Sequence, residues 1–162
     1  MSQPDSRLQQ TALIAEITAA LGVILSVIYL AVQVGGSTNA LRAQTHHNLL
    51  SQANEPILLS INNPELAEII RLGEADPGQL SESEWSRFAE YQLIAINSWE
   101  YGYYLNRDGS APPELWEGLN AYYANIAANR PGLKRFWGEM SFVYAEPFNS
   151  YADQYFEAPL EN

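Results

Sequence analysis

Residues Ile17 to Val34 read ITAALGVILSVIYLAVQV, eighteen positions in a row without a charged side chain. An α-helix rises about 1.5 Å per residue, so this stretch would be roughly 27 Å long, close to the thickness of the hydrocarbon core of a bilayer. Extending it backward to Ala12 adds a single charge, that of Glu16. The run therefore predicts a transmembrane helix over residues 12–34, preceded by a polar tail of residues 1–11.

Two other interpretations of this stretch are open. A secretory signal peptide has a basic start, an apolar core of about 7–15 residues and a small-residue cleavage site. Here the apolar run is longer, the tail has one basic residue, Arg7, and no such cleavage site follows. The core helix of a soluble protein is the other alternative, but such helices usually show a polar stripe or are shorter. The pattern favours a span over both.

Small and polar residues fall along one side of the predicted span, each three or four residues from the last. They are Thr18, Gly22, Ser26, Tyr29 and Gln33. Small residues at every fourth position let a second helix approach closely, which favours association in a solvent where apolar side chains gain little by pairing. This packing stripe predicts contact with another span, either a second copy or a partner subunit. The alternative is coincidence, since small residues are common in spans.

The rest of the chain predicts an all-α domain. Gly35-Gly36 and the capping residues that follow indicate a hinge at residues 35–39, with the soluble domain at residues 40–162. Hydrophobic positions there keep a helical spacing. Pro56 is expected to begin or kink a helix, and the longest helix is expected over residues 82–106. Other helix starts are indicated at Asn63-Pro64, Pro112-Pro113, Pro131-Gly132 and Glu146-Pro147. We expect a compact bundle of about five or six helices.

Composition restricts the function of this domain. After residue 36 the chain has 7 basic and 17 acidic residues, a net charge of −10. Such a surface repels phosphate backbones, so nucleic acid is not an expected partner. The absence of cysteine excludes disulfides and zinc–thiolate sites. Of 19 aromatic residues, 18 lie between Trp85 and Phe156, which predicts the position of the core.

The sequence lacks the patterns of the common enzyme classes. His46 and His47 are its two histidines, and neighbours on a regular helix point about 100° apart, so they cannot both bind one metal ion. Walker, zincin, di-iron and dinucleotide-binding motifs are absent. We therefore expect no enzyme, and we assign no catalytic residue, metal site or cofactor.

Two carboxylates lie in apolar surroundings. Glu100 is flanked by Trp99 and Tyr101 and is a candidate buried carboxylate. Burial would raise its pKa, and a raised pKa is what a general acid requires. The alternative is a structural role, hydrogen-bonded to a tyrosine or a helix end. Glu16 lies one residue outside the uncharged run, so we expect it at headgroup level. A functional intramembrane carboxylate is the other interpretation of Glu16.

Several short segments of the chain resemble segments of a known group of proteins. They are Ile28 to Val34, Thr38 to Ala43, Asn63 to Leu66, Trp99-Glu100 and Pro131 to Trp137. In these the chain resembles a family of small, uncharacterised bacterial membrane proteins with one N-terminal span and a helical domain. The resemblance implies a single-pass protein of the bacterial inner membrane with its soluble domain in the cytoplasm. Basic residues near the span do not decide the orientation, because Arg7 and Arg42 nearly balance.

These observations favour a membrane-anchored helical interaction or assembly protein. It would associate with itself, or serve as an accessory subunit of a larger membrane complex. The expected partners are membrane lipid and, through the span, a second copy or another membrane subunit. The alternative is a membrane-tethered sensor or ligand-binding domain, including an oligomeric conduit, since one helix cannot enclose a pore.

Overall fold

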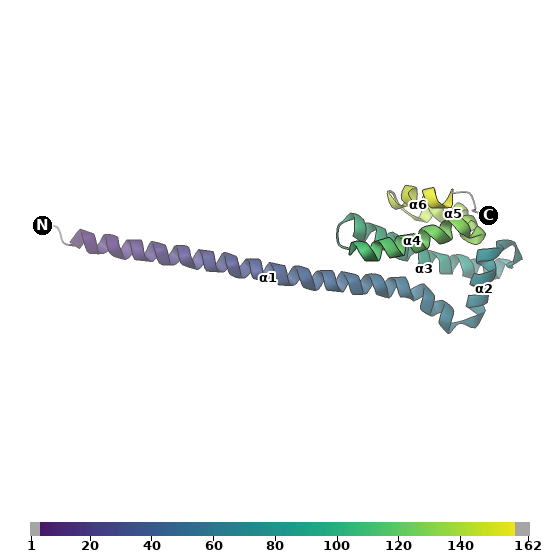
Figure 1. Cartoon of the computed structure of the whole chain (residues 1–162), viewed down its shortest axis with the longest axis horizontal. Coiled ribbons are helices and arrows are strands. Elements are labelled where there is room, and N and C mark those ends of the chain that lie inside the picture. The colour runs from purple at the N-terminus through teal and green to yellow at the C-terminus, as the bar shows by residue number, and fades with distance from the viewer. Residues whose placement is uncertain (1–3, 158–162) are drawn as a thin grey trace. The chain divides into compact units, whose positions relative to one another are not determined.

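The computed structural model describes residues 4–157 and is all-α, as predicted (Figure 1). Its α-helices are α1 (Pro4–Asn62), α2 (Pro64–Ala75), α3 (Glu82–Arg107), α4 (Pro113–Asn129), α5 (Pro131–Met140) and α6 (Phe148–Phe156). Two 3-10 turns, η1 (Pro77–Gln79) and η2 (Ser141–Val143), lie between them. The chain divides into two compact units after Ala43, so the apolar part of α1 and the helical bundle are described separately.

α1 differs from the prediction at residues 35–39, where the expected break is absent and the helix is continuous. Thr38 does not cap a new helix, because its Oγ1 donates to the carbonyl of Val34, 2.9 Å away, one turn back. Pro56 also lies inside α1 and does not begin a new helix. Each glycine costs a helix only about 1 kcal/mol relative to alanine, which long helical flanks can outweigh. The compact helical unit begins at Gln44.

The starts of α2 and α3 follow their capping residues. Asn63 Oδ1 accepts from the backbone N–H of Leu66 at 3.0 Å, and Pro64 occupies the first helical position of α2. Ser81 and Glu84 form a reciprocal capping box at the start of α3. α3 ends at Arg107, one residue beyond the prediction. Local hydrogen bonding therefore accounts for where α2 and α3 begin.

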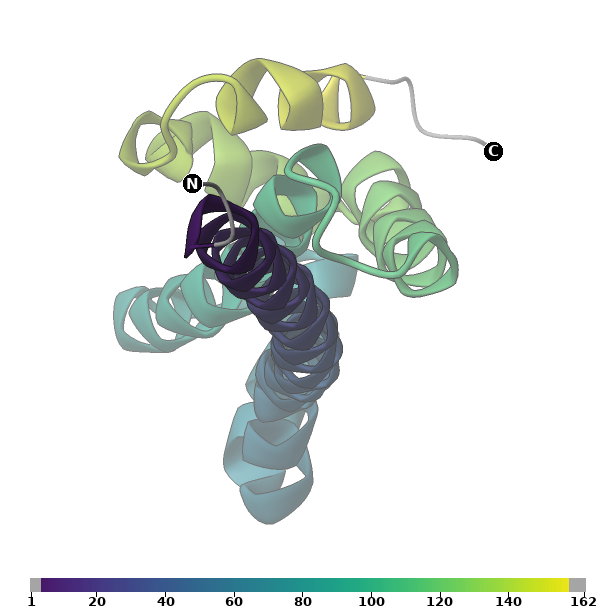
Figure 2. The same ribbon diagram turned by 90° about the vertical axis from the view of Figure 1, so that its left-hand side faces the viewer.

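α3 is the helix around which the others pack, with contacts to α2, α4, α5 and α6 (Figure 2). Trp99 lies at its middle with 0 % of its surface exposed. Its ring stacks on Tyr123 of α4 and meets the Phe148 ring of α6 edge-on, with centroids 5.6 and 5.5 Å away. The core thus lies where the aromatic residues predict, and Leu49 and Ile69 extend it.

Candidate functional site

The packing stripe of α1 is exposed along its length within this chain. Thr18 Oγ1 and Ser26 Oγ each donate to the carbonyl four residues back, at 2.8 Å. A Cβ placed on Gly22 would meet nothing within 4 Å, and Tyr29 is 69 % exposed. Gln33 is exposed as well. The stripe therefore presents small side chains at Thr18, Gly22 and Ser26, and the hydroxyls of Thr18 and Ser26 already have acceptors in their own helix.

Glu100, the candidate buried carboxylate, is half-buried on α3. Burial raises its pKa. Its negative charge acts on Tyr144, whose pKa is raised mainly by burial and further by Glu100. The Tyr144 hydroxyl is buried without a hydrogen-bond partner. Glu100 thus loses part of its hydration but keeps part of its surface in water.

Glu100→Gln tests whether this carboxylate supports the fold. Because burial raises the folded-state pKa, the stability that Glu100 contributes is present at low pH and is lost as the pH rises through that pKa. At pH 7 we expect the variant to melt at the wild-type temperature or slightly above it. The difference in melting temperature should vanish below the ordinary glutamate pKa of 4.5, where Glu100 and the substituted glutamine are both neutral. A Tm lowered by many degrees at pH 7 would show that the ionised Glu100 carboxylate makes a stabilising interaction in the fold.

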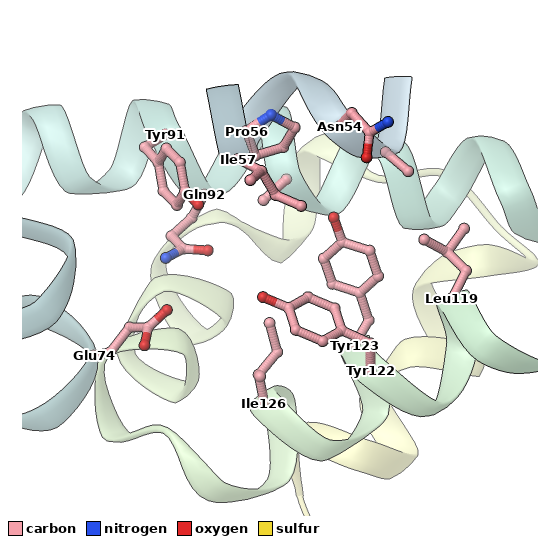
Figure 3. A pocket seen from close by; sticks show the side chains of 12 residues that line it. Asn54, Pro56, Ile57, Glu74, Tyr91, Gln92, Leu119, Tyr122, Tyr123 and Ile126 are labelled. Carbon is pink, nitrogen blue, oxygen red and sulfur yellow. The ribbon is translucent and has the colours of Figure 1, made fainter. Parts of the chain in front are cut away.

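A cavity of about 190 Å³ lies within the helical unit, and the sequence did not predict it (Figure 3). The last turns of α1, the middle of α3, the face of α4 and one residue of α2 line it. Its apolar wall includes Pro56, Ile57, Ala95, Leu119 and Ile126, and its polar groups belong to Asn54, Glu74, Tyr91, Gln92, Tyr122 and Tyr123. In Figure 3, Glu74 and Gln92 stand on one side of the space, opposite Tyr122 and Tyr123.

Two polar groups of this cavity are incompletely satisfied. Gln92 is 1 % exposed, and its Nε2 has no hydrogen-bond partner. Burial raises the pKa of Glu74, while the positive charge of Arg130 acts in the opposite direction. Arg130 Nε lies 3.8 Å from Glu74 Oε2, longer than a charge-assisted hydrogen bond of about 2.7–2.9 Å. Glu74 is therefore able to bind a further partner, whereas Gln92 Nε2 is closed off from the cavity.

The tyrosines of the cavity interact electrostatically with one another and with Glu74. Burial, with Tyr122 and Glu74 nearby, raises the pKa of Tyr91 to about 12. The pKa of Tyr122 is raised by burial and by Glu74, and that of Tyr123 by burial and by the other two tyrosines. The environment thus disfavours additional negative charge, while the rings and the Gln92 amide offer stacking and hydrogen bonding.

The described residues contain no group of three side chains arranged to hold a metal ion. His46 and His47 are both exposed on α1. Comparisons of the chain with protein-family models, curated proteins and solved structures found no match. Membership of the bacterial membrane-protein family therefore stays a prediction from short sequence motifs.

Proposed function

We propose that this protein is a single-pass protein of the bacterial inner membrane, anchored by residues 12–34 of α1, with its helical domain in the cytoplasm. The support is that the apolar stretch of α1 is an exposed candidate span, and none of its most apolar window is buried in the structure. A core helix would instead bury such a surface. A bilayer is the environment that removes this surface from water.

The function that we propose for this anchor is assembly, through the packing stripe, with a second copy or with a partner membrane subunit. The single observation that carries it is the open face around Gly22, where an added Cβ would meet nothing within 4 Å. The neighbouring hydroxyls of Thr18 and Ser26 donate to their own backbone, so neither is an unpaired donor where another helix packs beside Gly22 in lipid. Catalysis forms no part of this proposal.

Gly22→Leu should weaken the assembly, because a branched side chain holds the partner helix away from the stripe. The chain contains no cysteine, so a single Thr11→Cys substitution makes disulfide crosslinking in membranes a specific readout. We expect the crosslinked fraction to fall roughly tenfold, which corresponds to a loss of about 1.4 kcal/mol of association free energy.

Ile24→Leu, on the face away from the stripe, is the matched control and should leave the crosslinking unchanged. A crosslinked fraction that is the same in Gly22→Leu and wild type would contradict assembly through the stripe. Crosslinking to a different, larger species in native membranes would identify a partner subunit in place of a second copy.

A second candidate function is ligand binding by the helical domain, and the cavity beside Gln92 is the observation that favours it. α1 contributes Asn54, Pro56 and Ile57 to that cavity, and the same helix contains the candidate span. A ligand that contacts these residues would therefore bind to the helix that we propose as the anchor. This arrangement is suited to a membrane-tethered sensor.

A further inference from the structure

The size of the cavity restricts what it can hold. An apolar cavity of about 150 Å³ accommodates a molecule the size of benzene, so one of about 190 Å³ suits a ligand of roughly six to ten non-hydrogen atoms. The exposed side chain of Tyr122, 57 % accessible, lies at its edge. Peptides, nucleotides and lipid tails are too large to enter as a whole.

The charge of the lining restricts the ligand further. Glu74 is the one carboxylate among the lining residues, and no lysine or arginine lines the cavity. Three tyrosines surround the same space, and the negative faces of aromatic rings attract ammonium groups. Glu74 is partly stripped of water without a short hydrogen bond to Arg130, so a cation in the cavity would offset the cost of its burial. An anion would be repelled by Glu74.

The Gln92 amide adds a requirement for a hydrogen-bond donor. Its Nε2 is buried and does not face the cavity, whereas its carbonyl oxygen points toward the open space, on the same side as Glu74 (Figure 3). A ligand hydroxyl within reach of Oε1 would donate a hydrogen bond to it. A matching ligand therefore carries its hydroxyl a few bonds from its positive charge.

We infer that this cavity is a binding site for a free small organic cation, an alkylammonium compound that carries a hydroxyl group. This inference rests on the second candidate function, ligand binding by the helical domain, and is independent of assembly through the packing stripe. Tyr91, Tyr122 and Tyr123 would surround the ammonium group, Glu74 would neutralise its charge, and the carbonyl oxygen of Gln92 would accept a hydrogen bond from its hydroxyl.

The test is calorimetric titration of the full-length protein in dodecyl maltoside, a detergent without an ammonium group. Choline is the probe, because it joins an ammonium group to a hydroxyl. Its neutral isostere 3,3-dimethylbutan-1-ol has the same shape without the charge, and we expect it to bind at least tenfold more weakly. Equal binding of the two would contradict recognition of a cation, although it would leave the domain a ligand-binding module. Absence of binding by choline at millimolar concentration would overturn the inference.

Variants assign the roles of individual residues. Glu74→Gln should weaken choline binding about tenfold or more, and Tyr122→Leu roughly three- to thirtyfold. Glu114→Gln removes the same charge at an exposed position at the start of α4 and should change nothing. Each variant is compared at a temperature where its melting curve shows it folded. An unchanged affinity for choline in folded Glu74→Gln would contradict the role of Glu74 in neutralising the cation.

Gln92→Leu separates ligand recognition from a structural effect. Tetramethylammonium has the charge of choline but no hydroxyl, so wild type should prefer choline and Gln92→Leu should lose that preference. The variant should also be at least as stable as wild type, since it removes an amide nitrogen that is buried without a hydrogen-bond partner. A preference that survives in Gln92→Leu would contradict the role of the amide.

A last comparison concerns the source of the cation. Glycerophosphocholine is the water-soluble headgroup of a choline lipid, and its phosphate adds bulk and negative charge. Binding weaker than that of choline supports a free cation as the ligand. Tighter binding would assign the site to a lipid headgroup and contradict our inference.

Discussion

Gly132→Ala should leave much of the helical domain unfolded under conditions where the wild type is folded. Gly132 lies in the first turn of α5, where that helix crosses α2. A Cβ at this position would lie 1.9 Å from the carbonyl oxygen of Gly73 and 2.7 Å from its carbonyl carbon. Backbone atoms cannot move aside as a side chain can, so one helix must shift. We expect the free energy of unfolding to fall by about 3 kcal/mol or more, measured by urea unfolding.

Gly138→Ala is the matched control, because Gly138 belongs to the same helix and an added Cβ would meet nothing within 4 Å. Alanine favours a helix over glycine, so this substitution should raise the free energy of unfolding by about 0.5–1 kcal/mol. Equal stability of the two variants would contradict the close crossing of α2 and α5. Gly73→Ala should also destabilise the domain, since its Cβ would lie 2.5 Å from a ring carbon of Phe88.

Trp99→Ala should have an effect of similar size, for the opposite reason. It removes a wholly buried ring that contacts the rings of Tyr123, Phe148, Tyr151 and Tyr155, and it leaves a cavity in the core. The substitution also deprives Asn120 Oδ1 of the hydrogen bond from the indole Nε1, 2.8 Å away. The expected loss is about 3–5 kcal/mol, a large part of the stability of a typical domain. Thermal unfolding followed by circular dichroism measures it.

Phe142→Ala is the control for loss of an aromatic ring, because Phe142 is 77 % exposed. It should change the free energy of unfolding by less than about 0.5 kcal/mol. If Trp99→Ala melted at the same temperature as Phe142→Ala, the Trp99 ring would not hold α3, α4 and α6 together.

The features that were predictable from sequence are those with local causes. The uncharged run from Ile17 to Val34 indicates a candidate span because length and charge alone decide whether a helix suits a bilayer. Asn63 and Ser81 mark helix starts because a cap bonds to a residue three positions away. The predicted break in the helix at residues 35–39 is absent, because glycine lowers helix propensity only modestly and the helical flanks are long.

The sequence by itself therefore determined the all-α class, the helix starts, the candidate span and the region of the core. Only the tertiary structure decided the crossing of Gly73 with Gly132 and the cavity that gathers Glu74, Gln92 and Tyr122. Positions this far apart in the chain meet through the packing of whole helices, whose relative placement depends on the sum of many side-chain contacts. The exposure of Glu100 has the same origin. Its sequence neighbours predict an apolar setting, but the packing of the other helices around α3 sets how much water reaches its carboxylate.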